Sequence, residues 1–98
     1  MQRDVEKFVE FSSAHITEKD SQLLDEDETF GLVCHRYEYG YFIFNDIQES
    51  VLRDVGFSEA FINLFKEATK EGCWWIRLDS IAKVYDDLPT FDWYEEKV

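Results

Sequence analysis

Basic residues are scarce in this chain. Lys and Arg number 10 against 22 Asp and Glu, which gives a formal net charge of −12 at pH 7. Nucleic-acid binding normally draws its affinity from Lys and Arg side chains that neutralise phosphates, so we expect no direct binding of DNA or RNA. The same charge repels anionic membranes and attracts basic protein surfaces. The expected partner is therefore a basic protein surface, with solubility as the plainer role of the acidity.

Long apolar runs are also missing. No stretch approaches the roughly 20 residues that a membrane-spanning helix needs, and the chain starts without the apolar segment and cleavage site of a secretory leader. We therefore expect a soluble, cytoplasmic protein that does not bind membranes. Cysteine is limited to Cys34 and Cys73, each in an apolar, strand-like run. Reduced core thiols are expected in that compartment, and the sequence leaves open whether the two lie close together.

Motifs of metal sites and catalytic sites are absent. Two cysteines and two histidines are the only soft ligands, without C-x₂-C or H-x₃₋₅-H spacing. Ser12 and Ser13 lie beside His15, but no G-x-S-x-G elbow surrounds them and no orienting acid is identifiable. The paired carboxylates lack the apolar setting that would raise a pKa. We therefore expect no enzyme activity, no catalytic residue, no metal and no cofactor.

Aromatic side chains are plentiful by contrast, with nine Phe, five Tyr and three Trp in 98 residues. Each can bury about 150–250 Å², so the chain has ample material for a core although 33% of its residues are charged. This length is typical of a single domain. We interpret residues 1–98 as one acidic domain.

The densest apolar and aromatic run is Gly31–Phe44, in which Gly40 separates two stretches rich in strand-forming residues. The run predicts a strand, a tight reversal and a second strand. Side chains of a strand alternate between its two faces, and in Tyr41–Phe44 both sets are apolar. A strand that is apolar on both faces is expected at the centre of a sheet.

Helix signals precede and follow this hairpin. Thr17 is a good N-cap with Asp20 three residues on, so we expect a helix from Glu18 to about residue 24 or 27. After the hairpin, Asn45 as N-cap and Gln48 at the third helical position resemble a capping box, which predicts a second helix with Gly56 as its C′ stop.

A third helix is predicted between Ser58, as its N-cap, and Gly72, as its stop. Its apolar side chains follow i, i+3, i+4, i+7 spacing at Phe61, Leu64, Phe65 and Ala68. This spacing gives one apolar face that can pack on a sheet.

Strand patterns occur near both ends of the chain. Val5–Phe11 predicts an N-terminal strand. Cys73–Leu78 predicts another, with Trp74 on the same face as Ile76 and Leu78, and Ile81–Tyr85 predicts its hairpin partner. Residues 90–93 are expected to cover the sheet as an aromatic tail. The fold class is therefore α+β, with a mostly antiparallel sheet of about five strands and helices packed on one face.

Carboxylates cluster in two segments. Residues 18–28 hold six acids and one Lys, and residues 84–96 hold five acids and no base. Duplex DNA carries one charge per ~1.7 Å of its axis, so a row of carboxylates could occupy a cationic nucleic-acid channel. A solvated acidic face is the alternative. Tyr and Trp concentrate at interaction hot spots, although packing in the sheet is the simpler explanation for each. The predicted partner-binding residues are Asp25, Glu26, Asp27, Glu28, Asp86, Asp87, Asp92, Tyr37 and Tyr39.

Several short stretches together resemble a family of small uncharacterised proteins carried by bacterial plasmids, integrative elements and prophages. The matching pieces are Ser13-Ala14-His15-Ile16-Thr17, Tyr39-Gly40-Tyr41-Phe42, Gly72-Cys73-x-Trp75 with Asp79, and Leu88-Pro89-Thr90-Phe91-x-Trp93. They cover the chain from about residue 11 to 93. The family is a domain of unknown function, so the resemblance implies a mobile element as genomic context and no catalytic assignment.

Small, acidic, non-enzymatic proteins of such elements often resemble inhibitors of host defence, including anti-CRISPR and anti-restriction proteins. The resemblance therefore implies a protein that binds and inhibits a nucleic-acid-handling defence complex, with DNA mimicry as one route. The alternative is an accessory protein-interaction module, such as a toxin–antitoxin partner or a homodimeric scaffold, whose acidity is incidental.

Overall fold

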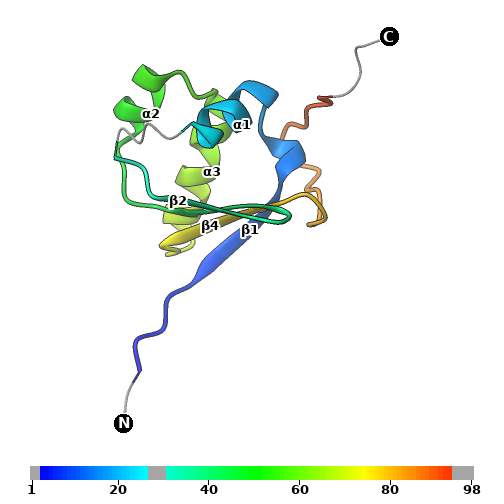
Figure 1. The fold of residues 1–98 in the computed structure, drawn as a ribbon. Helices are drawn as coiled ribbons and strands as arrows, with labels where there is room; N and C mark the ends of the chain where they lie inside the picture. Colours follow the sequence, from blue (N-terminus) through cyan, green and yellow to red (C-terminus); the bar gives the residue numbers. More distant parts are fainter. Residues whose placement is uncertain (1–2, 27–30, 94–98) are drawn as a thin grey trace.

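The computed structural model describes residues 3–26 and 31–93, in which three α-helices lie over one face of a four-stranded sheet (Figure 1). The strands are β1 (Phe8–Ser12), β2 (Cys34–Tyr37), β3 (Gly40–Phe44) and β4 (Trp75–Asp79). The helices are α1 (Glu18–Asp25), α2 (Glu49–Val55) and α3 (Glu59–Lys70), and a 3₁₀ helix, η1, spans Ser13–His15. The predicted α+β class, with helices on one face, is confirmed.

The strand order β1-β4-β3-β2 corrects the predicted sheet. β1 pairs with β4 in parallel, and the other two pairs are antiparallel, so the sheet is mixed. Within the described residues it has four strands, not about five. The predicted partner strand Ile81–Tyr85 does not form. β1 and β3 already occupy both sides of β4, so no pairing position remains for it.

The prediction that the second strand of the first hairpin is central is confirmed, because β3 lies between β4 and β2. The reversal occupies Glu38 and Tyr39, and Gly40 begins β3. A Cβ atom on Gly40 would lie 1.8 Å from the Leu78 carbonyl oxygen of β4. Only glycine therefore fits where the two backbones meet.

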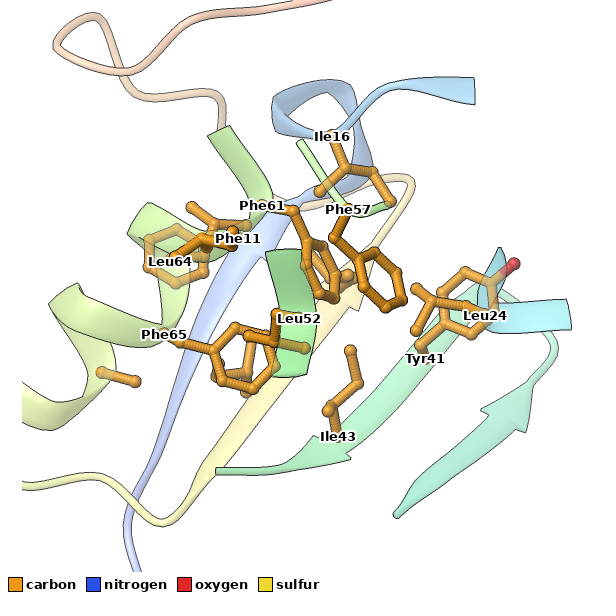
Figure 2. Close-up of a cluster of buried hydrophobic side chains, with 14 of the residues drawn as sticks. Phe11, Ile16, Leu24, Tyr41, Ile43, Leu52, Phe57, Phe61, Leu64 and Phe65 are labelled. Carbon is orange, nitrogen blue, oxygen red and sulfur yellow. The ribbon is translucent and has the colours of Figure 1, made fainter. Parts of the chain in front are cut away.

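The core lies between the helices and the sheet (Figure 2). The predicted apolar face of α3 is buried, and Phe61 stacks on Phe57 with ring centroids 4.3 Å apart. From the sheet side, Tyr41 and Ile43 of β3 face this cluster. Burial of one such side chain contributes about 1.5–3 kcal/mol, so this layer contributes substantially to the stability of the fold.

Asp20 joins the starts of two helices. As predicted, it completes a capping box with Thr17 at the start of α1. Its carboxylate also accepts from the backbone N–H of Ser58 (2.8 Å) and from the Ser58 hydroxyl (2.6 Å), and that hydroxyl caps α3. Asp20 is fully buried. One carboxylate therefore accepts hydrogen bonds at the starts of both α1 and α3.

The start of α2 corrects a second prediction. Gln48, not Asn45, is the N-cap residue, and it makes no side-chain capping bond. The Asn45 amide instead donates to the Thr69 hydroxyl and to the Cys73 carbonyl, 3.1 Å in each case. Asn45 thus joins the end of β3 to the end of α3, and helix formation begins only at Glu49.

Residues 80–93 form a C-terminal strap that packs on η1. The backbone N–H of Phe91 donates to the Ala14 carbonyl (2.8 Å), and the Trp93 indole donates to the Ile16 carbonyl (3.0 Å). The aromatic tail predicted at residues 90–93 is therefore present, but it lies against η1 and not across the sheet. The prediction of its place was wrong because these backbone and indole donors find partners at the start of the chain.

His15 is the fully buried link between η1 and the strap. Its Nδ1 lies 2.8 Å from the Pro89 carbonyl oxygen, and its Nε2 accepts from the backbone N–H of Tyr85 (3.0 Å). This pairing requires the neutral ring with its proton on Nδ1. Both ring nitrogens hold the strap, so neither is available to activate a serine.

Candidate partner-binding surface

The helices leave one face of the sheet uncovered (Figure 1). Strand residues that alternate with the buried ones place aromatic side chains on this face. We call this surface the open face, and its rings are those of Phe8, Phe42, Phe44, Trp74 and Trp75. Phe8 is 47% exposed and Trp74 is 53% exposed, and the other three rings are partly exposed. A contiguous apolar surface of this kind is typical of a protein–protein contact.

Strand pairing brings these rings together. Trp75 of β4 lies opposite Phe8 of β1 and Phe44 of β3. Trp75 stacks on Phe42 with centroids 5.0 Å apart and contacts the ring of Phe44 at 4.8 Å. The ring of Phe44 also stacks on Trp74 at 5.9 Å. The aromatic surface is therefore held in place before any partner arrives, which lowers the entropy cost of binding.

The prediction that Trp74 shares a face with Ile76 and Leu78 was wrong. It lies before β4 begins, where its N–H bonds the Lys7 carbonyl and its own carbonyl accepts from the Asn45 N–H. The N–H and the carbonyl of Trp74 therefore bond to segments on opposite sides of β4. The regular alternation of side chains between the two faces starts only at Trp75. Ile76 and Leu78 enter the core as predicted, whereas Trp74 joins the open face.

A hydrogen-bonded network fixes the polar end of the open face. The Tyr37 hydroxyl donates to Asp79 (2.5 Å), and Arg77 donates to both the Tyr37 hydroxyl (3.0 Å) and Asp79 (3.2 Å). The bond from Tyr37, then the one from the Ile81 N–H, lower the pKa of Asp79. Burial, then the bond to Asp79, raises the pKa of Tyr37. Tyr37 and Arg77 are thus held in one orientation at the surface.

Tyr37 and Tyr39 are both exposed, by 37% and 45%, with their rings edge to face at 6.3 Å. Tyr37 also lines a shallow hollow of about 430 Å³ on the open face with His35, Arg36, Phe42 and Arg77. Tyr39 lines a different groove, of about 500 Å³, which it shares with Asp92 of the strap. The structure therefore brings together two predicted residues, Tyr39 and Asp92.

The first predicted acidic cluster is partly engaged within the fold. Asp25 accepts from Arg36 (3.0 Å) and from the Tyr41 hydroxyl (2.7 Å), so its carboxylate ties α1 to the sheet. Burial first, with Asp25 adding to it, raises the pKa of Tyr41 to about 12. Glu26 is exposed. Asp27 and Glu28 lie outside the described residues.

In the second predicted acidic cluster, Asp87 lies near two glutamates that were not identified from the sequence. Asp86 and Asp87 are exposed. Asp87 lines a groove of about 420 Å³ together with Glu67 of α3 and Glu71, the residue that caps the end of α3. Those two glutamates lie four residues apart, next to the apolar stripe of α3, and this spacing is the signal that could have grouped them. Their closeness to Asp87 depends on the path of the strap.

The two cysteines are not joined to each other by a disulfide. Cys73 is buried and Cys34 is half-buried. Burial, with a smaller contribution from Asp25, raises the pKa of the Cys34 thiol to about 11, which keeps it protonated and unreactive. Among residues 3–26 and 31–93, no three His, Cys, Asp or Glu side chains are placed to hold a metal ion. None of the helices in these ranges has the length and hydropathy needed to cross a membrane.

The comparison with protein families covers the segment that forms the fold. Residues 8–93, from the first residue of β1 to the end of the described strap, match a family of unknown function described as the DUF5983 C-terminal domain. The chain belongs to the DUF5983 family. Searches among curated proteins and among solved structures found no match.

The stretches that suggested an uncharacterised family lie inside the DUF5983 match, and the fold gives each a structural role. The first and last stretches bind each other through His15, the strap and η1. Gly40 allows β3 to approach β4. Gly72, at φ +75°, follows the end of α3 in a conformation that other residues rarely adopt. The prediction of an uncharacterised family is confirmed.

Proposed function

We propose that this DUF5983 protein is a non-enzymatic inhibitor that binds a basic surface of a nucleic-acid-handling defence complex in a bacterial host. The observation that carries the proposal is the open face, a fixed aromatic surface on a chain of net charge −12. Aromatic side chains are the commonest anchors of protein interfaces. The excess negative charge attracts a basic target over a distance and speeds the encounter. No catalytic step is required of the chain.

In this proposal the protein is encoded by a mobile element or a phage and acts in the host cytoplasm as an anti-CRISPR or anti-restriction protein. The arrangement of the acids favours occlusion of the target over close imitation of a DNA backbone. Asp25 is paired with Arg36, and Asp87 and Asp92 line different grooves. The acids then steer the complex together, while the open face supplies the contact area.

The test begins with capture of a partner from the host lysate by the tagged protein, followed by mass spectrometry and purification of the complex. The affinity should fall at least tenfold between 50 and 300 mM salt, because surface charges are screened over about a Debye length. The double variant Asp86→Lys/Asp87→Lys should weaken binding, whereas Asp54→Lys on the exposed surface of α2 should have a smaller effect. Direct binding of the purified protein to DNA or RNA would contradict the proposal.

The second candidate is an accessory protein-interaction module whose acidity is incidental, such as a toxin–antitoxin partner or a homodimeric scaffold. The pairing of Asp25 with Arg36 and Tyr41 favours it, because this acid has a structural role. This candidate predicts that charge reversal leaves partner binding unchanged and that substitution of open-face rings abolishes it. A homodimer would be recognised by its mass in light scattering and by its loss in the variant Trp74→Ser.

A further inference from the structure

β1 is an edge strand, and one side of its backbone has no partner strand among the described residues. It stands at one end of the strand order, with β4 as its single neighbour in the described sheet. The Lys7 carbonyl accepts from the Trp74 N–H (3.2 Å), so the backbone groups of Lys7 face β4. Backbone groups alternate along a strand, and those of Val9 therefore also face β4, while those of Phe8 and Glu10 face outward. The outward groups can pair with another chain.

A groove of about 420 Å³ lies beside this edge on the helix side of the sheet. Its apolar lining comes from the strand and the strap, through Val9, Phe11, Tyr85 and Leu88. Its acidic lining comes from α3, the residue that caps its end and the strap, through Glu67, Glu71 and Asp87. Lys7 also lines the groove, and its Nζ donates to the Glu71 carbonyl (2.7 Å). A groove lined by both apolar side chains and carboxylates suits the long stem and charged head of Lys or Arg.

We propose that β1 and this groove bind an extended basic segment of a partner protein, which adds to the sheet beside β1. The partner's backbone would pair with the outward groups of Phe8 and Glu10. Its alternate side chains would enter the groove, with aliphatic stems on Tyr85 and Leu88 and cationic heads near the three carboxylates. Charge complementarity selects a basic occupant, because an acidic segment would be repelled by the carboxylates of the groove.

The other side chains of the bound segment would point to the opposite side of the sheet. Phe8 and Glu10 project there, and the Phe8 ring lies 5.6 Å from that of Phe42. The added strand would therefore extend the open face, so that one partner could cover both surfaces. The choice of a basic partner rests on the proposed function. The groove further indicates that the bound part of the partner is a basic segment in an extended conformation.

The first experiment uses the full chain and a capped ten-residue peptide of alternating Lys and Val as the probe. Calorimetry should give one site, and amide NMR shifts should include Phe8, Glu10 and Leu88. A peptide of alternating Glu and Val should not bind. Two further Lys–Val peptides carry backbone N-methyl groups at odd or at even positions. One of the two should lose binding and the other should keep it, since alternate residues of an added strand point their N–H groups away from β1.

The second experiment changes the groove. The double variant Glu67→Gln/Glu71→Gln should bind the Lys–Val peptide about tenfold more weakly, because it removes two of the carboxylates that face the lysines. The matched control Glu18→Gln/Asp54→Asn makes the same change of charge on exposed residues of α1 and α2 and should bind nearly as well as the parent. Glu10→Pro removes an outward N–H and should weaken binding, whereas Glu10→Gln should not.

The results separate this proposal from the proposed function. Equal binding of both N-methylated peptides, NMR shifts confined to the open face, or equal affinities of the groove variant and its control would each overturn the edge-strand site. A captured host complex would then still support the inhibitor. Conversely, peptide binding at β1 by a protein that captures no nucleic-acid-handling complex would support the site and count against the inhibitor.

Discussion

Both faces of β3 are apolar in sequence, and they differ in what covers them. On β3, Tyr41 and Ile43 lie under the helices and are 7% and 0% exposed. Their neighbours Phe42 and Phe44 lie on the open face and remain partly exposed. The apolar residues on both faces of the strand indicate that both faces favour contact with other apolar groups. The pattern does not indicate whether those groups belong to the same chain or to a partner. The helix-covered face forms the core, and we propose that the open face binds a partner.

The sharpest comparison of the two faces substitutes adjacent residues of β3. Ile43→Ala should lower the free energy of unfolding by about 3 kcal/mol, because it leaves a cavity under the helices. Phe42→Ala should cost about 1 kcal/mol, because its ring is already partly in water. Urea denaturation measures both. Equal losses at the two positions would mean that the open face is a second core.

Substitution of Asp20 tests the hydrogen bonds that hold the starts of α1 and α3 together. Asp20→Ala should lower the free energy of unfolding by about 3 kcal/mol, because it leaves buried donors of α1 and α3 without an acceptor. Thr17→Ala is the control, since it removes one cap only and should cost about 1 kcal/mol. A loss at Asp20 no larger than that at Thr17 would contradict its role at both helices.

Release of the strap should have a smaller, local effect. His15→Ala should cost about 2 kcal/mol, because the Tyr85 N–H and the Pro89 carbonyl lose a buried partner. Hydrogen exchange at Tyr85 and Phe91 should accelerate more than exchange in α3. Uniform acceleration across the domain would indicate that the strap is part of one cooperative unit with the core.

The two faces should also affect the pH dependence of stability in different pH ranges. Asp79, near the open face, has a pKa below its usual 3.8, so it stabilises the fold above that value and the stabilisation is lost as acid protonates it. Tyr37→Phe should reduce this loss, since the Tyr37 hydroxyl is the main cause of the lowered pKa. Tyr41, on the covered face, has its pKa raised from 10.0 to about 12, so its contribution is lost as pH rises through that range. Denaturation curves between pH 2 and 12 measure both.

Local signals in the sequence predicted the parts of the fold that depend on neighbouring residues. The capping box at Thr17 and Asp20, the stripe of α3 and the central place of β3 were predicted and are present. The pairing of β1 with β4 was not, because it joins segments from opposite ends of the domain. That pairing determines the strand count and leaves residues 81–85 as part of the strap.

The candidate surfaces were predictable in composition but not in arrangement. Tyr37 and Tyr39 are exposed as expected of partner-binding residues, and whether they bind a partner stays a prediction. The role of Asp25 at Arg36 and Tyr41 depends on contacts between α1 and the first hairpin, which no local pattern encodes. The open-face rings come from three strands and a loop, so only the strand register assembles them.

The most direct test of the whole account compares binding and stability in one variant of the open face. Phe8→Ser/Trp74→Ser replaces its two most exposed rings. We predict that its affinity for the purified host complex falls at least about 100-fold, as expected for two interface anchors, while the free energy of unfolding changes by less than about 1 kcal/mol. An unchanged affinity in this stable variant would contradict the claim that the open face binds the partner.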